Sequence, residues 1–164
     1  MIRRPHAPTR LAKPFRRAAL AALAAVVALA LAGPAAAQDL RLTGLGGEQL
    51  RGGDLAQGTT IVVVWASWSP RGRDVVPRVN ALAGRWGRQA RVITVNFQED
   101  RPTVERFLAG KGLSVPVFLD ADGAFSKRYA VTNLPGLVVI QNGETAYNSK
   151  LPDDPNAVLG EILR

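Results

Sequence analysis

Two uninterrupted runs of largely β-branched residues limit the folds open to this chain. Thr60–Trp65 (TIVVVW) and Val92–Phe97 (VITVNF) lack the regular apolar–polar alternation of a half-buried strand, so each is predicted to form a strand that is buried on both faces. Such strands belong to parallel sheets, which carry helices on either side. The two runs therefore favour an α/β fold.

The segments that follow the two runs carry helical signals. Ser69 is a good N-cap and Pro70 fits the first helical position, so a helix is predicted from here towards Gly87. Pro77 lies inside that segment and is expected to kink the helix. A second helix is predicted over Arg101–Lys111, which has a proline near its start and a glycine just past its end.

Shorter elements are predicted in the rest of the chain. A third strand is expected over Val115–Leu119, short or at a sheet edge because Pro116 cannot donate to the ladder. Asn142-Gly143 is the strongest hairpin signal. A glycine-rich lead-in with room for a small hairpin covers Gln38–Gly58. One or two helical turns are predicted over Ala124–Tyr129, and an amphipathic helix over Pro155–Leu163 closes the chain. This order predicts a mixed, mostly parallel sheet flanked by helices.

The first 37 residues have the three parts of a secretory signal. Basic residues precede the apolar run Ala18–Ala32, and small residues close the segment at Ala35–Ala37, so cleavage is predicted after Ala37. The predicted organisation is a signal peptide over 1–37 and one domain over 38–164.

An uncleaved anchor in the inner membrane is the competing interpretation of this segment. The apolar run is short for a span of about 20 residues, and it is mostly alanine, which partitions weakly into lipid. The predicted location is therefore the periplasm, with contact to the membrane only if the signal stays attached.

The net charge of +8 comes mainly from the predicted signal. Six of the 21 basic residues and none of the 13 acidic residues lie there, which leaves 15 basic and 13 acidic residues, a net charge of +2, from Gln38 onward. A nearly balanced surface without a basic block has nothing to follow a phosphate backbone. No nucleic-acid partner is therefore predicted.

Removal of the signal would leave a chain of unusual chemistry. The only methionine and histidine are Met1 and His6, and the chain has no cysteine. Thiol nucleophiles, imidazole bases and the preferred ligands of copper, zinc and haem iron are then all missing. No metal and no cofactor are predicted, and the domain has to be stabilised by its hydrophobic core alone.

Two segments carry a resemblance to a known family. Val64–Arg73 (VWASWSPRGR), with Pro77 after it, resembles the active-site stretch WASWCxxCR of TlpA/ResA-type extracytoplasmic thiol–disulfide oxidoreductases, which have a proline five residues after the second cysteine. Tyr129–Pro135 (YAVTNLP) resembles the segment that leads to their cis-proline. The resemblance covers essentially all of Leu40–Arg164 and implies a thioredoxin-like fold.

The chemistry of that family does not carry over to this chain. Ser69 stands at the position of the first cysteine and Gly72 at that of the second. The family reaction needs a thiolate that attacks a disulfide and a second thiol that resolves it, whereas a serine hydroxyl ionises far above neutral pH and glycine has no side chain. The buried acid that many thioredoxins use as a proton relay corresponds to Val63. The sequence therefore predicts a redox-inactive pseudoenzyme with no catalytic residue.

The resemblance implies a surface that needs no thiol. In the family, the cis-proline loop lies against the active-site turn and its backbone pairs with an extended segment of the partner. The predicted binding groove consists of Trp68, Ser69, Pro70, Arg71, Gly72, Leu134 and Pro135. For each position a structural role competes with binding: Trp68 is an interface anchor or a packed side chain, Ser69 a ligand contact or the N-cap, and Pro135 a contact or a turn that the fold requires.

Two arginines beside the predicted helix start have a similar pair of interpretations. Arg71 and Arg73 could form a weak anion site with the helix N-terminus. A solvated face, partly neutralised by Asp74, is the alternative and is favoured, because positive charge at a helix N-terminus is mildly unfavourable.

The function predicted from the sequence is that of a protein-binding or accessory module. Its partner would be another exported or membrane protein, and family analogy suggests cytochrome c maturation, copper-centre assembly or envelope redox homeostasis as the setting. The alternatives are an enzyme without thiols that uses Ser69, for which only Lys111, Lys127 and Lys150 could serve as the base, and a functional relic.

Overall fold

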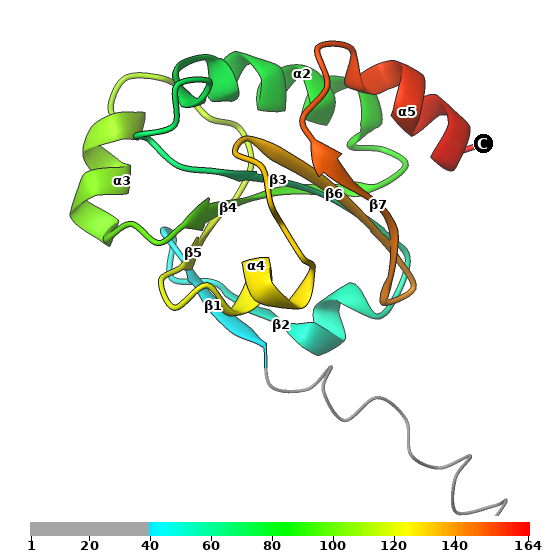
Figure 1. Ribbon diagram of the computed structural model, residues 1–164, viewed down its shortest axis with the longest axis horizontal. Coiled ribbons are helices and arrows are strands. Elements are labelled where there is room, and N and C mark those ends of the chain that lie inside the picture. Colours follow the sequence, from blue (N-terminus) through cyan, green and yellow to red (C-terminus); the bar gives the residue numbers. More distant parts are fainter. Residues whose placement is uncertain (1–39) are drawn as a thin grey trace, which may run out of the picture. The chain divides into compact units, whose positions relative to one another are not determined.

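The computed structural model describes residues 40–164. The predicted signal peptide and its cleavage after Ala37 lie outside the described residues. Within that part, which belongs to one of the two compact units of the chain, a single sheet has the strand order β2-β1-β5-β4-β3-β6-β7 (Figure 1). The strands are β1 (Arg41–Gly44), β2 (Gln49–Arg51), β3 (Thr59–Trp65), β4 (Arg91–Phe97), β5 (Val117–Asp120), β6 (Gly136–Gln141) and β7 (Glu144–Lys150).

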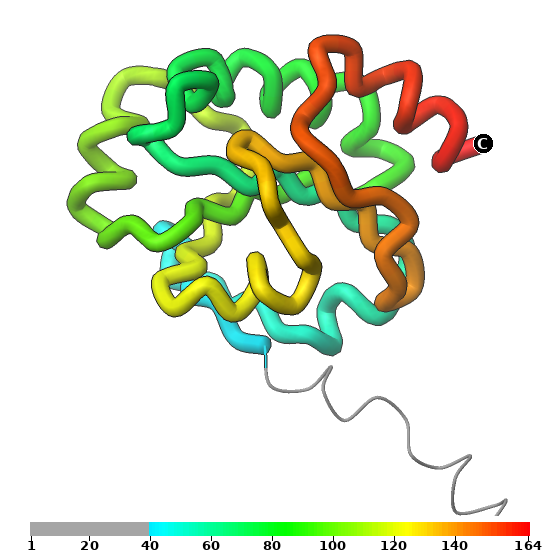
Figure 2. Tube along the Cα trace, viewed as in Figure 1, coloured from blue at the N-terminus to red at the C-terminus, as the bar shows by residue number. Residues whose placement is uncertain are grey.

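The sheet is mixed, as the sequence predicted, and its parallel part lies at the centre, but the expectation of a mostly parallel sheet is wrong: four of the six strand pairs among residues 40–164 are antiparallel. β3 pairs with β4 and β4 with β5 in parallel, whereas the pairs β1–β2, β1–β5, β3–β6 and β6–β7 are antiparallel. Figure 2 shows the N-terminal hairpin and the C-terminal hairpin at opposite edges of this sheet. The carboxyl ends of β3 and β4 therefore lie side by side in the middle of the molecule.

Helices cover both faces of the sheet. They are α2 (Val75–Trp86), α3 (Arg101–Leu108), α4 (Ala124–Arg128) and α5 (Pro155–Ile162), with the short 3-10 turns η2 (Gly52–Leu55) and η3 (Gly72–Asp74). α2 and α5 lie over one face and α4 over the other (Figure 1). The fold is a thioredoxin-like α/β fold in which helices flank a mixed sheet.

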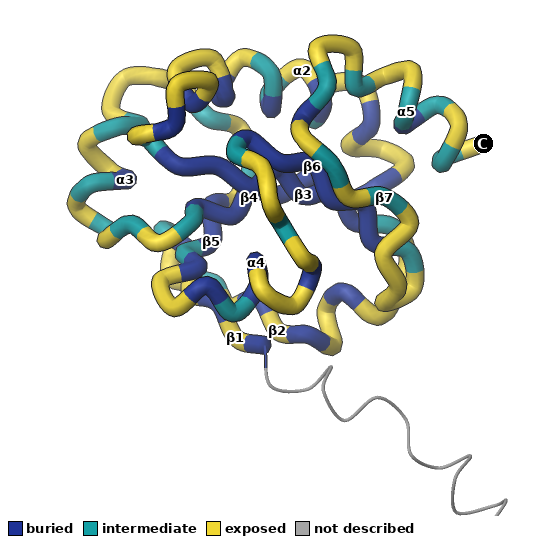
Figure 3. The backbone as a smooth tube through the Cα atoms, in the orientation of Figure 1, coloured by how far each residue is buried: buried dark blue, intermediate teal, exposed yellow. Residues whose placement is uncertain are grey.

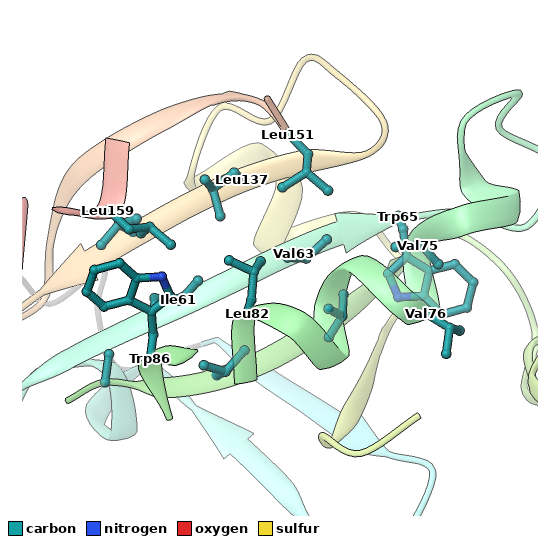
Figure 4. Packing of buried hydrophobic residues seen from close by; sticks show 14 of the residues in the cluster. Ile61, Val63, Trp65, Val75, Val76, Leu82, Trp86, Leu137, Leu151 and Leu159 are labelled. Atoms are coloured by element: carbon teal, nitrogen blue, oxygen red, sulfur yellow. The ribbon is translucent and has the colours of Figure 1, made fainter. Parts of the chain in front are cut away.

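Strand β3 is buried on both sides, as its continuous apolar run predicted. Ile61, Val63 and Trp65 pack into the cluster between the sheet and the helices α2 and α5 (Figure 4). Val62 and Val64 pack into the cluster around α4. All five side chains are fully buried, and the central strands accordingly form the dark interior of Figure 3, whereas β7 is largely exposed.

The start of the first helix was predicted wrongly. α2 begins at Val75, and residues 69–71 form a turn that η3 follows. Pro77 is therefore the third residue of α2, where its missing amide hydrogen has no intrahelical acceptor to lose. Pro77 was expected inside a longer helix, which it would kink. In the structure the 3-10 turn η3 precedes α2, and Pro77 lies in the first turn of α2.

Two further boundaries differ from the prediction. β5 is short but does not lie at an edge, because the N-terminal hairpin adds β1 to its free side. Pro116 stands just before the strand and leaves its ladder intact. α3 ends at Leu108, three residues early, because Ala109 leaves helical geometry and Gly110 takes a φ of 73°.

The remaining elements agree with the sequence. β1 and β2 form the small hairpin expected in the glycine-rich lead-in. Asn142 and Gly143 have φ angles of 50° and 87°, the left-handed pair that a two-residue type I′ turn between β6 and β7 needs. α4 and α5 lie where the short and the closing helix were predicted.

Candidate functional site

The loop after β3, residues 66–74 (loop 66–74 below), follows the course of two overlapping turns. The Ser69 amide donates to the Ala66 carbonyl at 3.2 Å, and the Gly72 amide donates to the Ser69 carbonyl at 2.8 Å. Gly72 is buried, and a Cβ atom at this position would overlap the carbonyl oxygen of Ala66. The position that corresponds to the second cysteine of the family therefore has no space for any side chain.

Ser69 joins this loop to the cis-proline loop, residues 130–135. Its side chain is buried, and its hydroxyl donates to the carbonyl oxygen of Leu134 at 2.8 Å. The predicted N-cap role is wrong, because the hydroxyl faces another loop and no helix begins at this residue. The Leu134-Pro135 peptide bond is cis, as the resemblance implied. One serine thus fixes the spacing of the two loops.

Among residues 40–164 no lysine is hydrogen-bonded to the Ser69 hydroxyl, although Lys150, one of the three candidate bases, lines a hollow with Leu134. The hydroxyl proton is directed at an amide carbonyl, an acceptor that cannot take the proton up. Lys111 lies over the ring of Phe107, with 3.2 Å between Nζ and the ring centroid, and the Lys127 ammonium donates to a backbone carbonyl at 3.4 Å. The serine–lysine pair of the enzyme alternative gains no support from these contacts.

The two tryptophans of the motif have opposite environments. Trp65 is fully buried and stacks at 5.2 Å, centroid to centroid, on Phe107. Trp68 is 63% exposed, and no other large hydrophobic side chain among residues 40–164 is exposed. Packing therefore does not account for Trp68. An exposed indole beside the two loops is the kind of side chain that anchors protein interfaces.

Sequence reasoning missed Glu99, which holds the base of the loop. Its carboxylate accepts from the Ser67 amide at 2.7 Å, from the Ser67 hydroxyl, and from the Asn96 side-chain amide at 2.7 Å. The signal was available: Asn96 pairs with Trp65 at the ends of the parallel strands β4 and β3, and polar residues that follow such ends meet at one edge.

A hollow of about 270 Å³ lies between the two loops and the end of β7. We call it the first hollow; it is lined by Arg71, Asn133, Leu134, Pro135, Lys150 and Leu151. Of the predicted groove residues, the structure brings Arg71, Leu134 and Pro135 together here. Trp68, Ser69, Pro70 and Gly72 do not line it, and Ser69 and Gly72 are buried beneath the surface.

A second hollow of about 220 Å³ adjoins the same loop. It is lined by Phe97, Ser126, Val131, Thr132 and Leu134. The Ser126 hydroxyl is already bonded to the buried carboxylate of Asp120 at 2.7 Å, so the lining offers mainly apolar surface. Leu134 is the residue that the two hollows share.

The predicted anion site at the helix N-terminus is not assembled as expected. Arg71 precedes η3 and Arg73 lies within it, so neither belongs to the first turn of α2, and Asp74 precedes that turn without a side-chain cap. Arg73 is exposed and lines neither hollow. Only Arg71 of the two faces a concave surface.

Residues 40–164 contain neither a helix that could span a membrane nor a group of metal-ligating side chains. None of the helices in this part has both the length and the apolar character that a membrane span requires. No three side chains among its acidic, histidine and cysteine residues are grouped as metal ligands would be.

Comparison with known proteins agrees with this architecture. Residues 31–162 match the family model described as Redoxin. Thiol-disulfide oxidoreductase ResA of Geobacillus kaustophilus (strain HTA426) is 29% identical over 110 residues, which cover 66% of this chain and 63% of that protein. The match therefore spans less than two thirds of the relative's length.

Solved structures share the fold over most of their length. A putative thiol:disulfide interchange protein DsbE from Chlorobium tepidum has a TM-score of 0.66 and 25% identity, over 77% of this chain and 92% of that chain. The pneumococcal exposed lipoprotein thioredoxin of Streptococcus pneumoniae strain TIGR4 has a TM-score of 0.66 and 21% identity, over 75% and 96% of the respective chains. This chain is a TlpA/ResA-type, thioredoxin-like protein without cysteine, and it belongs to the Redoxin family.

Proposed function

We propose that this protein is a redox-inactive, exported binding module that engages an extended segment of another envelope protein. The partner would lie across the cis-proline loop and against Trp68. The observation that carries the proposal is the 63% exposure of Trp68 on a loop that Ser69 joins to Leu134. The relatives named as oxidoreductase and interchange protein suggest envelope redox maintenance as its setting, in which this chain would bind without transferring electrons.

The backbone of the cis-proline loop supports one part of this pairing. The Pro135 carbonyl already accepts from the Leu151 amide at 2.8 Å, and the Leu134 carbonyl accepts from Ser69. The Leu134 amide has no acceptor among residues 40–164. A donor of this kind, beside a hollow, suits the carbonyl of an added extended segment.

The periplasm is the proposed location. The predicted signal over 1–37 favours export, and the pneumococcal relative is named an exposed lipoprotein. An exported domain without cysteine is insensitive to the thiol–disulfide balance of that compartment, which suits a binding role.

Affinity capture from native periplasm and membranes tests the proposal. The tagged protein is compared with a Trp68→Ala/Leu134→Ala variant and with Arg88→Ala, an exposed site that lines a separate hollow beside the start of β4. We expect a partner that is retained by the wild type and by Arg88→Ala and is lost from the double variant. Capture of the same proteins by all three, or of none, would contradict the proposal.

Two single substitutions, compared with each other, separate this proposal from the enzyme alternative. Binding through an exposed indole predicts that Trp68→Ala loses the partner, whereas Ser69→Ala, which loosens one hydrogen bond, keeps most of the affinity. A serine nucleophile predicts the reverse order of effects on the cellular function. Circular dichroism on both variants confirms that each is folded.

A further inference from the structure

The two hollows adjoin the cis-proline loop and share one lining residue. Leu134 lines both of them, its neighbour Asn133 lines the first, and Thr132 lines the second. Side chains on an extended segment point to the same face at every second residue, about 7 Å apart. An extended segment whose backbone passes the Leu134 amide lies beside both hollows, because Leu134 lines both of them.

The first hollow is cationic. Arg71 comes from loop 66–74 and Lys150 from the end of β7, and both are exposed. Neither Arg71 nor Lys150 forms an ion pair with another of residues 40–164, so neither cation of the hollow is neutralised. No acidic side chain lines it.

That concentration of charge is local. The chain from Gln38 onward has a net charge of only +2, and two cations that share one concave surface repel each other. A carboxylate placed between them gains from both, since charges near a concave surface are screened less than charges in bulk water.

The second hollow has the opposite character. Phe97, Val131 and Leu134 provide apolar surface, no charged side chain lines it, and its Ser126 hydroxyl is occupied by Asp120. An apolar side chain of moderate size fits such a lining better than a charged one, because desolvating a charge without a partner is costly.

We infer that the partner segment is an acidic, extended peptide that carries a carboxylate residue for the first hollow and an apolar residue for the second. The carboxylate lies against Arg71 and Lys150, and the apolar side chain enters the second hollow. This inference rests on the proposed function and goes further, since it names the chemistry of the segment that the module takes.

Fluorescence anisotropy with two matched peptides tests the inference. One fluorescein-labelled peptide of glycine and serine carries a leucine and a pair of glutamates, one of which stands two positions from the leucine. The other peptide has lysines in place of the glutamates. With protein purified after expression of the full chain, we expect the acidic peptide to bind roughly fivefold to tenfold more tightly, since each exposed ion pair contributes modestly. The preference should shrink as salt is raised.

Charge reversal provides the variant and its control. Arg71→Glu/Lys150→Glu should invert the preference in favour of the lysine peptide. Arg73→Glu makes the same change on the same loop but lines neither hollow, and it should alter the ratio by less than about twofold. Chemical shifts of the Leu134 amide should move on binding of the acidic peptide.

The outcomes separate this inference from the proposed function. Equal binding of both peptides, or no binding of either, overturns the acidic preference, as does a Leu134 amide that does not shift. The capture experiment with Trp68→Ala/Leu134→Ala does not depend on peptide charge. It therefore decides the binding role on its own, whichever way the peptides behave.

Discussion

Position 72 has room for a hydrogen atom and nothing larger. The carbonyl oxygen of Ala66 approaches Gly72 so closely that any Cβ would overlap it. Loop 66–74 has thus taken a backbone course that the second cysteine of the family could not share. Restoring the two cysteines by Ser69→Cys/Gly72→Cys would require this backbone to move, so sequence reversion alone does not rebuild the family site.

Gly72→Ala measures the cost of that close approach. We expect a loss of about 1–3 kcal/mol in the free energy of unfolding, the usual cost of overpacking in a well-packed region. Gly84→Ala is the matched control, because a Cβ at Gly84, on α2, meets nothing within 4 Å and the change should be neutral or stabilise by about 0.5–1 kcal/mol. Urea denaturation compares the two, and equal effects would refute the steric explanation.

At the scale of elements, sequence patterns predicted which helices and strands form, whereas tertiary contacts determine where helix α2 begins. The strands β3 and β4 and the hairpin at Asn142-Gly143 follow from local signals. The start of α2 does not, because the Ser69 hydroxyl that suits an N-cap is bonded instead to Leu134, 65 residues away. A competing long-range acceptor leaves no trace in the local sequence.

The candidate site was predictable only where a motif marked it. Arg71, Leu134 and Pro135 follow from the family resemblance, and the cis bond was expected with them. Lys150 reaches the same hollow because β7 pairs with β6 in a register that sets it opposite Gly136. That register depends on strand pairing across the sheet, so no pattern around Lys150 could have assigned it to the site.

Helix α3 supplies a prediction about acid. Two hydrogen bonds lower the pKa of the N-cap Asp100 below 3.8: the larger effect comes from the side chain of Thr103 and the smaller from its amide. A carboxyl whose folded pKa is depressed stabilises the fold above its unfolded pKa, and this contribution is lost as the pH falls through the folded pKa. We expect α3 to fray first below about pH 4.

The carbon chemical shift of the Asp100 carboxyl, followed by NMR through an acid titration, checks this. Thr103→Val removes the hydroxyl, so the pKa of Asp100 should rise towards its ordinary value. Asp100→Asn should leave the Thr103 amide insensitive to pH in the same range. An Asp100 that titrates at its ordinary value in the wild type would disprove the capping account.

At the scale of the whole molecule, the fold is stabilised by an apolar core, with no disulfide and with valine at the position of the family's buried acid. Apolar side chains form one cluster between the sheet and the helices α2 and α5, from Trp65 through Val63 to Leu159 (Figure 4). Position 63 corresponds to the buried acid of many thioredoxins. Val63 is instead part of the apolar cluster, so the core is continuous there and no carboxyl stands at this position.

Val63→Asp tests whether the core still tolerates an acid there. Val63 is fully buried, and a carboxylate at this depth without a partner is held neutral by a raised pKa. In the unfolded chain the introduced carboxyl ionises near pH 4. Between that pH and its raised pKa in the folded state, only the folded state keeps the proton, so the free energy of unfolding falls by about 1.4 kcal/mol for each unit that the pH rises. We expect the variant to be more stable at pH 4 than at pH 7, whereas Val63→Asn, which cannot ionise, should be destabilised about equally at both. Urea unfolding at the two pH values measures this difference. A Val63→Asp variant without the pH dependence would mean that water or a polar partner stabilises the charged carboxylate at position 63.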